Sequence, residues 1–448
     1  MDAATDTIVA IATPPGSGGI GVLRVSGPLA AKIAQALAGE LPSPRRARLA
    51  SLRDEHGALI DRALLLYFEA PHSFTGEHVL EIHAHGAPVV LDALRRHVCA
   101  LGARPARAGE FSERAFLNGK LDLVQAEAIA DLIASKSQAQ ARAASRSLQG
   151  EFSTRVQALL HALIEVRAQI EAAIDFPEEE IDFLSDPALR SRLDGVCEQM
   201  HSLLDQARRG VRLTDGLHVA IVGRPNVGKS SLLNALAADE RAIVAEIPGT
   251  TRDVLREEVR IDEVTLTLAD TAGLRESMEP IESEGIRRAR AELVRADVAL
   301  LVTEAADMEV DLALLQEVPP SVSRLIVINK IDLQDARPSR GTRAGIEMIA
   351  LSARTGAGLD LLRSALKQLA GGNDAEQGAF SARARHVLAL ECARRHVDAA
   401  IDVLRTSRAG ELAAEELRQA QRHLGEITGE FSTEDLLGAI FSTFCIGK

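Results

Sequence analysis

The stretch "GRPNVGKS" places Gly223, Gly228, Lys229 and Ser230 at the spacing G-x-x-x-x-G-K-S of a phosphate-binding loop. A predicted strand of four apolar residues, 219–222, leads into it, and a predicted helix, "SLLNAL", follows it. In such a loop the backbone N–H groups face the phosphates, the lysine reaches the β and γ phosphates, and the serine hydroxyl coordinates Mg²⁺. We therefore expect a nucleotide site with Lys229 in a catalytic role and Ser230 as a metal ligand.

Two further motifs fit the phosphate and metal side of the same site. The stretch "GTTRD" offers Thr251 as a switch threonine that closes on Mg²⁺. The stretch "DTAG" follows a predicted strand and places Asp270 near the metal, with Gly273 beside the γ-phosphate.

The last two motifs select the base. In "LIVINKID", a predicted strand ends with Asn329, Lys330 and Asp332. An aspartate there accepts hydrogen bonds from N1–H and the 2-amino group of guanine, donors that adenine lacks. The stretch "LSAR" supplies the last loop on the base side, so the predicted nucleotide is GTP rather than ATP. The predicted GTP-binding residues are Asn226, Val227, Gly228, Lys229, Ser230, Ser231, Ala245, Glu246, Ile247, Pro248, Gly249, Thr250, Thr251, Asp270, Thr271, Ala272, Gly273, Asn329, Lys330, Asp332, Ser352, Ala353 and Arg354.

The group that orients the attacking water is not the usual one. Many small GTPases carry a glutamine directly after D-x-x-G, whereas this chain has Leu274. Asn226 could help bind a monovalent cation that supplies charge where an arginine finger otherwise would. Glu282 could reach the water, although its position alone favours a solvated carboxylate at a helix start.

The length of 448 residues fits about three domains. Residues 1–118 mix short apolar runs with Gly/Pro turns and one helical stretch, which is typical of an α+β domain. Residues 119–212 have the spacing of long helices, 213–372 alternate strands and helices as in a parallel α/β sheet, and 373–448 return to helices. The predicted fold is therefore a P-loop Ras-like α/β domain inserted in an all-α domain, preceded by an α+β domain.

Composition excludes several classes of protein. No apolar run approaches the roughly 20 residues needed to cross a bilayer, and the N-terminus lacks the basic region of a signal peptide. The four cysteines are far apart, which excludes the usual zinc and dithiol patterns and favours a cytoplasmic location. A net charge of −13 argues against charge-driven RNA coating, so the basic runs at 44–48, 94–97 and 393–396 are only candidate RNA contacts.

Cys445, in the terminal sequence "CIGK", allows four interpretations. Glycine and lysine fit a prenylation box poorly, and a disulfide is improbable in the cytoplasm. A buried structural thiol is compatible with the apolar "LLGAIFSTF" before it. The fourth interpretation is a reactive thiol that a packed C-terminal helix carries into an active site.

The N-terminal region holds residue types that a pterin needs. A pterin pairs its N3–H and 2-amino edge with a carboxylate, and its glutamate tail needs cations; Glu81 with Arg24 and Lys120 would supply them. Such a set is more often a surface group. His83 and His85 would share one face of a strand, and without a third ligand a hydrogen-bonded role is favoured over a metal site.

Four stretches carry a resemblance to the bacterial and organellar tRNA-modification GTPases of the MnmE (TrmE) family over essentially the whole chain. They are "DTIVAIATPPGSGGIGVLRVSGP", "AGEFSERAFLNGKLDLVQAEAIADLI", the GTPase motifs "GRPNVGKSSLLNAL" and "IPGTTRD", and the terminal "FCIGK". The phosphate loop alone would be shared with ribosome-assembly GTPases, whereas the first, second and last stretches are specific to this family.

The resemblance implies a homodimer whose N-terminal domain binds 5,10-methylenetetrahydrofolate, with 5-formyltetrahydrofolate as an analogue. It implies an FAD-dependent partner of the MnmG type, in a heterotetramer or larger complex. Together the two proteins would add an aminomethyl or carboxymethylaminomethyl group to C5 of the wobble uridine of certain tRNAs. GTP hydrolysis would be stimulated by K⁺ and by pairing of the G domains.

The resemblance also implies roles for individual residues. Glu282 would orient the water through a bridging solvent molecule, and Cys445 would act in tRNA modification rather than in GTP hydrolysis. The implied ligands are Ser230 and Thr251 for Mg²⁺, Asn226 with backbone oxygens of Ala245, Ile247 and Thr250 for K⁺, and Arg24, Glu81, Lys120 and Lys448 for folate.

The chain departs from the family pattern near the implied folate pocket. Relatives often have Asp where this chain has His78, Gly where it has Ala84 and Ala87, and Pro where it has Ala108. The main alternative function is a GTP-dependent ribosome-assembly switch without folate chemistry. The motifs at the two ends of the chain weigh against this alternative, and the lack of a spanning segment weighs against a membrane-transport GTPase.

Overall fold

The computed structural model describes residues 6–175, 187–237, 256–261, 264–270, 293–294, 296–320, 322–369, 380–407, 409–431 and 434–447. The chain divides into two compact units, and each is described by itself. The first comprises Met1–Ala134, Ala144–Leu203 and Leu388–Lys448, and the second comprises Ser135–Ala143 and Leu204–Val387.

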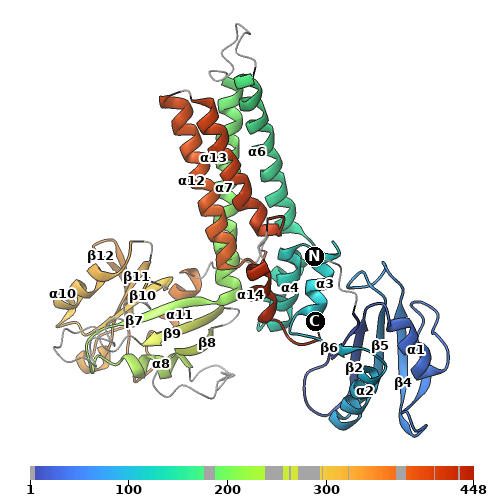
Figure 1. Cartoon of the computed structure of the whole chain (residues 1–448). Helices are drawn as coiled ribbons and strands as arrows, with labels where there is room; N and C mark the ends of the chain where they lie inside the picture. The colour runs from blue at the N-terminus through green and yellow to red at the C-terminus, as the bar shows by residue number, and fades with distance from the viewer. Residues whose placement is uncertain are drawn as a thin grey trace, which may run out of the picture. The chain divides into compact units, whose positions relative to one another are not determined.

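The first unit begins with a six-stranded sheet in the order β3-β4-β5-β2-β1-β6. Its strands are β1 (Ile8–Ile11), β2 (Gly18–Ser26), β3 (Arg48–Arg53), β4 (Leu59–Phe68), β5 (Val79–Gly86) and β6 (Arg104–Pro105). Neighbouring strands are antiparallel except for β1 and β6, which run parallel. Figure 1 shows this sheet with its helices α1 (Ala30–Ala38) and α2 (Pro88–Ala100).

Buried apolar residues alternate with other residues along the strands, and the apolar ones form the face of this sheet that packs against α1 and α2. Leu23, Leu65 and Ile82 are fully buried and pack in one core with Ile33 of α1 and Leu94 of α2. Because side chains alternate across a strand, the residues between them, including Arg24 and Glu81, lie on the opposite face. Arg24 and Glu81 therefore lie on the face away from α1 and α2, where Ile8 and Ala10 pack with Phe111 in a second, smaller cluster.

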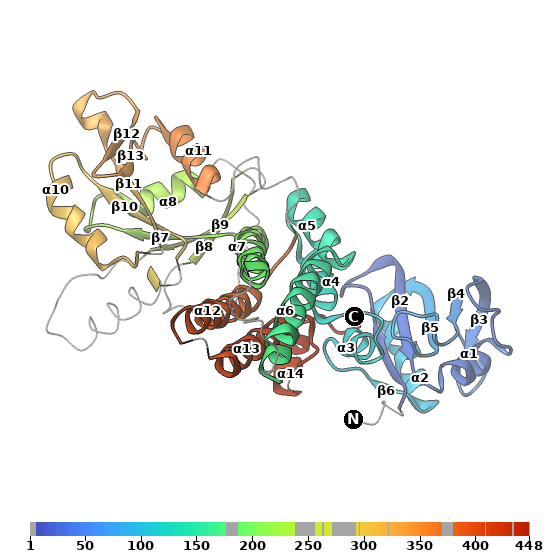
Figure 2. The same ribbon diagram turned by 90° about the horizontal axis from the view of Figure 1, so that it is seen from above.

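Long helices make up the rest of the first unit. They are α3 (Glu110–Leu117), α4 (Leu123–Ala134), α5 (Gln138–Leu148, which continues from the second unit), α6 (Glu151–Asp175), α7 (Pro187–Asp215, as far as Leu203), α12 (Ala384–Thr406, from Leu388), α13 (Gly410–Thr428) and α14 (Glu434–Ser442). Figures 1 and 2 show α6, α7, α12 and α13 side by side as a bundle. Helical spacing on α6 buries Leu163, Val166 and Ile170, and Leu424 of α13 is likewise fully buried.

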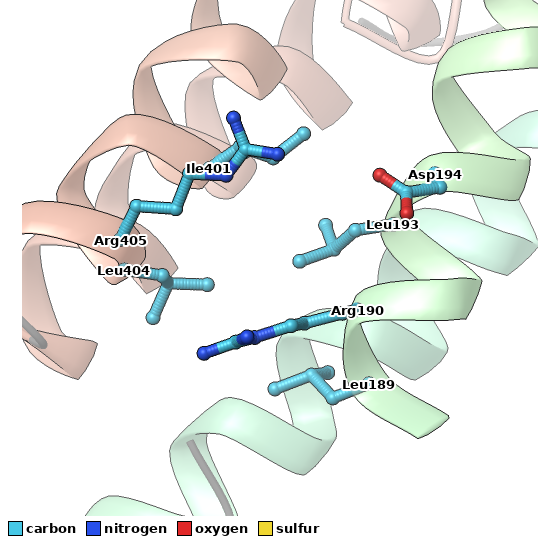
Figure 3. Close-up of a pocket in the computed structure, with 7 residues that line it drawn as sticks. All are labelled: Leu189, Arg190, Leu193, Asp194, Ile401, Leu404 and Arg405. Carbon is cyan, nitrogen blue, oxygen red and sulfur yellow. The ribbon is translucent and has the colours of Figure 1, made fainter. Parts of the chain in front are cut away.

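A pocket of about 100 Å³ lies between α7 and α12. Figure 3 shows it, with Arg190 of α7 pointing toward Leu404 of α12. Its lining residues are Leu189, Arg190, Leu193, Asp194, Ile401, Leu404 and Arg405. None of the predicted site residues lines it.

The C-terminal helix packs against the beginning of the helical region. Phe441 and Phe444 contribute to one buried cluster with Leu123 and Ala126 of α4. The apolar run that precedes "CIGK" therefore anchors the end of the chain within the first unit.

The second unit contains a seven-stranded sheet in the order β12-β13-β11-β10-β7-β9-β8. Its strands are β7 (Leu217–Val222), β8 (Arg256–Ile261), β9 (Val264–Asp270), β10 (Val298–Thr303), β11 (Ser323–Ile328), β12 (Ser339–Arg343) and β13 (Ile346–Ala350). The five central strands run parallel, and the edge strands β8 and β12 are antiparallel to their neighbours. The helical segments described are α8 (Lys229–Ala237), α10 (Met308–Asp311), η2 (Leu312–Glu317), η3 (Ile331–Gln334) and α11 (Leu359–Leu369).

Both faces of the second sheet are buried, as expected for parallel strands with helical connections. Val219 and Ile221 of β7 pack in one core with α8 and α11, while Ala220 and Val222 pack with Leu315 of η2 on the other face. Every residue of β10 is buried, which is why the sequence "VALLVT" has no polar alternation. The predicted fold class, an α/β P-loop domain with an all-α and an α+β part, is confirmed.

In the described part of the chain, no helix is long and apolar enough to cross a membrane. The boundaries predicted at residues 118, 212 and 372, and the cytoplasmic location, stay predictions.

Candidate functional site

The phosphate loop connects the end of β7 to the start of α8. Gly223 has φ +154°, and a Cβ there would lie 2.2 Å from the carbonyl oxygen of Val302. Gly228 has φ +95°, and a Cβ there would lie 2.3 Å from the Asn329 side-chain nitrogen. Both positions therefore require glycine, which explains the spacing that the sequence shows.

Loop carbonyls hold the lysine of the motif. Lys229 is buried, and its Nζ donates to the carbonyl oxygens of Gly223 and Arg224, both at 2.9 Å. Asn226 has φ +67°, in the left-handed region that non-glycine residues rarely adopt, and its carbonyl accepts a hydrogen bond of 2.7 Å from Lys330 Nζ. The loop is thus shaped by contacts within the protein.

Asn329 joins the phosphate loop to the loop that ends in Arg354. Its Nδ2 donates to the carbonyl of Val227 at 2.9 Å, and its Oδ1 accepts the backbone N–H of Ala353 at 2.9 Å. Ser352 Oγ donates to Asp332 Oδ1 at 2.6 Å. In the described residues the other oxygen of Asp332 accepts no hydrogen bond, so it can accept one from a base.

The structure therefore brings together the motifs around Lys229, Asn329 and Ser352 at one edge of the sheet. They follow β7, β11 and β13, three parallel strands whose carboxyl ends meet at this edge, where α/β sheets bind ligands. Ser230 and Ser231 lie in the exposed first turn of α8.

Other predicted residues cannot be placed in this way. Asp270 is the last residue of β9. It is in register with Ile221, the second-last residue of β7, and so lies near the start of the phosphate loop. The remaining predicted switch residues lie outside the described residues: Ala245, Glu246, Ile247, Pro248, Gly249, Thr250, Thr251, Thr271, Ala272, Gly273 and Glu282.

Sequence reasoning missed three carboxylates beside the phosphate loop. Glu304 pairs with Lys330 at 2.7 Å, and Asp307 and Asp311 pair with Arg224 at 3.2 and 2.5 Å. Arg224 stands inside the motif, but the carboxylates lie in "TEAADMEVD", which matches no nucleotide-binding pattern. The only sequence signal is their position just after a buried strand of the sheet.

Arg24 and Glu81 form the centre of a second site, in the first unit. They face each other on β2 and β5, and Glu81 Oε1 accepts hydrogen bonds from Nε and Nη2 of Arg24 at 3.0 and 2.8 Å. The guanidinium carbon lies 5.6 and 5.9 Å from the ring centres of Phe74 and Phe111. This largely buried pair places a carboxylate and a cation together, as the pterin hypothesis requires.

The end of the chain reaches the same pair. Arg24 Nη1 donates to the carbonyl of Gly447 at 3.4 Å, and Ile446 forms an antiparallel bridge with Ala108. The backbone N–H of Gly109 lies 3.5 Å from the carbonyl oxygen of Cys445. The Cys445 side chain is exposed, which contradicts a buried structural thiol.

Lys120, a further predicted folate residue, does not bond to Glu81 in the described structure. Its Nζ donates to the carbonyl of Pro71 at 3.1 Å. Lys448 lies outside the described residues, directly after Gly447.

The two neighbouring histidines are held by carboxylates. Asp61 accepts the backbone N–H and Nδ1 of His85, each at 2.8 Å, and His83 Nε2 lies 3.3 Å from Glu81 Oε2. Burial raises the pKa of Asp61, but the hydrogen bonds from His85 outweigh it and lower the pKa below its usual value. Both histidines thus lie within hydrogen-bond distance of a carboxylate.

His78, one of the predicted departures near the folate pocket, acts as a hydrogen-bond acceptor. Its Nδ1 lies 3.3 Å from the backbone N–H of Ala70, which can only donate, and 2.7 Å from the hydroxyl of Tyr67. The ring nitrogen is therefore the acceptor toward both groups, which share its single lone pair. At Ala108, another predicted departure, the bridge to the terminal segment uses the N–H of the next residue, Gly109.

An ion network in the first unit is centred on the buried side chains of Arg114 and Glu110. Arg114 pairs with Asp6 at 2.7 Å, with Glu77 at 3.1 Å and with Glu110 at 3.1 Å, and Arg104 pairs with Glu110 at 2.5 Å. Burial raises the pKa of Glu110, but hydrogen bonds from Arg104, the Arg107 backbone and Arg114 lower it overall. Because α3 follows Gly109, this network fixes the segment on which the end of the chain lies.

Comparison with known proteins gives matches along the whole chain. The family model described as GTP-binding protein TrmE N-terminus matches residues 7–120, and the MnmE helical domain matches residues 123–445. The tRNA modification GTPase MnmE of Alkalilimnicola ehrlichii is 54% identical over 446 residues, covering 99% of this chain and 100% of the relative. The protein of the same name from Methylococcus capsulatus is 53% identical over 443 residues, covering 99% of both chains. The G domain of the T. maritima FeoB iron transporter is 28% identical, with a TM-score of 0.27, over 34% of this chain and 98% of its own.

Proposed function

Because the chain belongs to the MnmE family of tRNA modification GTPases, we propose that it uses GTP hydrolysis to drive addition of an aminomethyl or carboxymethylaminomethyl group to C5 of the wobble uridine of certain tRNAs. The enzyme hydrolyses GTP to GDP and phosphate, binds Mg²⁺ with the nucleotide and acts on tRNA. The observation that carries the nucleotide assignment is the bridge that Asn329 forms between Val227 and Ala353.

Lys229 would stabilise the charge that develops on the β and γ phosphates during hydrolysis. The loop carbonyls of Gly223 and Arg224 hold its ammonium at the loop that would face the phosphates. Ser230 and Thr251 would hold Mg²⁺, which bridges phosphate oxygens and neutralises their charge. The Ser230 hydroxyl has no partner among the described residues, so it is available for this role.

Asn226 would bind K⁺ together with the backbone oxygens of Ala245, Ile247 and Thr250. Its backbone carbonyl is engaged by Lys330, which leaves the exposed side-chain amide for the cation. The cation would supply positive charge that small GTPases otherwise take from an arginine finger, and Glu282 would orient the attacking water. We propose that the G domains pair across a homodimer during this step.

Arg24 and Glu81 would bind a tetrahydrofolate carrier, 5,10-methylenetetrahydrofolate. Among the residues that the structure describes, Glu81 Oε2 is within hydrogen-bond distance of His83 only, and a pterin edge could share this oxygen. Lys120 and Lys448 would meet the glutamate tail. Cys445 would act on the uridine or on the one-carbon unit, since its exposed thiol belongs to a segment held by Arg24.

An FAD-dependent protein of the MnmG type would complete the reaction in a heterotetramer or larger complex. In this proposal, residues 1–118 would form the folate-binding domain and residues 213–372 the GTP-binding domain. Residues 119–212 and 373–448 would form the helical domain in two parts. The alternative, a ribosome-assembly switch, needs no folate site and leaves the Arg24–Glu81 pair without a ligand.

The test is the GTP hydrolysis rate in KCl and in NaCl at equal ionic strength, with ATP as the control nucleotide. We expect a much higher rate in KCl and none above background with ATP. Equal rates in both salts would refute the cation site. Absence of wobble-uridine modification in reactions supplied with partner, folate and tRNA would favour the switch instead.

A further inference from the structure

Asp311 is a buried carboxylate that the known motifs do not explain. It ends α10 and is 1% exposed, and both its oxygens are engaged. Oδ1 lies 2.5 Å from Arg224 Nε, and Oδ2 accepts a hydrogen bond of 2.6 Å from Thr303 Oγ1. Burial of a charge is costly, and a buried ion pair is often no more stabilising than apolar residues of the same size. Stability alone therefore does not explain Asp311, and its role follows from the side chain that it holds in place.

The partner of Asp311 belongs to the phosphate loop. Arg224 is the second residue of the motif, and its Nη1 donates to Asp307 at 3.2 Å. The same residue uses its backbone carbonyl to accept Lys229 Nζ. Two carboxylates thus fix the side chain of a residue whose carbonyl holds the ammonium that meets the phosphates.

A third carboxylate of the same segment reaches the loop at another point. Glu304 directly follows β10 and pairs with Lys330 Nζ at 2.7 Å. That Nζ also donates to the carbonyl of Asn226. We name Glu304, Asp307 and Asp311 together the acidic strut.

We propose that the acidic strut positions the phosphate loop for nucleotide binding, with Asp311 and Asp307 acting through Arg224 and Glu304 acting through Lys330. This inference rests on the assignment of the loop as the GTP site. The strut carries negative charge beside an anionic ligand, so its two cationic partners must both fix the loop and neutralise the carboxylates. Removing Arg224 would leave Asp311 buried without its cation and expose the nucleotide to repulsion.

The test is a double-mutant cycle in nucleotide affinity, measured on the full chain by titration with a fluorescent GDP analogue. The variants are Arg224→Gln, Asp311→Asn and the double variant. Each single variant should weaken binding by roughly tenfold, as loss of a charged hydrogen bond does. The double variant should bind no more weakly than Arg224→Gln alone, because both changes remove one interaction.

A matched control comes from the same helix. Glu309 of α10 pairs with Arg343 of β12, and both side chains are exposed. Glu309→Gln should leave the affinity unchanged. An equal loss in this control would mean that α10 is merely loosened and would overturn the inference, as would additive losses in the cycle or a lowered Tm with unchanged affinity.

Should Asp311→Asn fail to fold, Asp307→Asn takes its place in the cycle, because its side chain is 47% exposed. Its expected loss is smaller, roughly two- to threefold, with the same non-additivity toward Arg224→Gln. If the wild-type chain itself bound no guanine nucleotide, the proposed function would fail. If the wild type binds and the cycle is additive, only the strut is refuted.

Discussion

Arg24 and Gly447 lie near opposite ends of the chain and are joined by a hydrogen bond of 3.4 Å from the guanidinium to the glycine carbonyl. The same guanidinium is paired with Glu81, so one cation connects the sheet of the first unit to the terminal segment. The segment that carries the exposed thiol of Cys445, the fourth residue from the end, is therefore held at a defined place. Chain ends without such contacts are usually poorly ordered.

Gly447→Ala should displace the terminal segment. Gly447 has φ +98°, and a Cβ there would lie 2.7 Å from the carbonyl oxygen of Ile11. The conformational cost alone is about 1–2 kcal/mol, which would lower the docked population by roughly tenfold. We expect wobble-uridine modification to fall accordingly while the GTP hydrolysis rate stays at the wild-type value.

The matched control is Gly438→Ala, in α14 of the same segment. A Cβ at Gly438 meets no atom within 4 Å, and alanine favours a helix. This variant should keep full modification. Equal losses in both variants would mean that the terminal segment tolerates no substitution, and the docking argument would fail.

Cys445→Ser should separate the two activities of the enzyme. Serine keeps the size of the side chain but not the reactive thiolate, so modification should be lost while GTP hydrolysis is retained. The half-buried Cys392 of α12 is the control, since Cys392→Ser should affect neither activity. Unchanged modification in Cys445→Ser, measured by mass spectrometry of the tRNA nucleosides, would rule out a chemical role for this thiol.

The GTP-site motifs could be identified in the sequence because each motif is local and follows a predicted strand. The parallel order of β7, β11 and β13 then brings Lys229, Asn329 and Ser352 together without further information. Contacts between a motif residue and a residue outside any motif could not be predicted from the sequence. The pairing of Arg224 with Asp311 depends on how α10 follows β10, and Asp311 carries no motif of its own.

The Arg24–Glu81 site likewise contains contacts that the sequence alone does not show. Arg24 and Glu81 were predicted as a set of residue types, but only the register of β2 with β5 shows that they touch. Lys120 belonged to the same set, yet it donates to Pro71, because its place after α3 is fixed by the turn that follows the helix. Surface lysines give no pattern from which such a contact could be read.

Asp332→Asn should change which base the enzyme prefers. The oxygen of Asp332 left free by Ser352 is a pure acceptor, whereas asparagine would present N–H donors to guanine N–H groups. Loss of hydrogen bonds to a charged group predicts a fall in GTP affinity of roughly 10- to 100-fold. Xanthosine triphosphate, which carries a carbonyl in place of the 2-amino group, should bind the variant better than the wild type does. Equal GTP affinity in variant and wild type, measured by competition with a fluorescent GDP analogue, would remove Asp332 from the base site.

Glu110→Gln should change how stability depends on pH. The folded-state pKa of Glu110 is lowered, since hydrogen bonds from Arg104, the Arg107 backbone and Arg114 outweigh the effect of burial. A depressed carboxylate contributes stability that is present above the unfolded pKa, about 4.3, and is lost as pH falls through the folded pKa. In the wild type, the free energy of unfolding of the first unit should therefore fall as the pH drops below about 5.

In Glu110→Gln that contribution is absent at every pH. The variant should be destabilised at pH 7 by about 3–5 kcal/mol, because Arg104 and the buried Arg114 lose a partner. Its unfolding free energy should fall less steeply with acid, by up to about 1.4 kcal/mol per pH unit. Glu55→Gln, at an exposed carboxylate, is the control and should keep the wild-type slope. Urea unfolding followed by circular dichroism between pH 3 and 7 measures both quantities, and identical slopes in Glu110→Gln and wild type would mean that the network is not ionised as described.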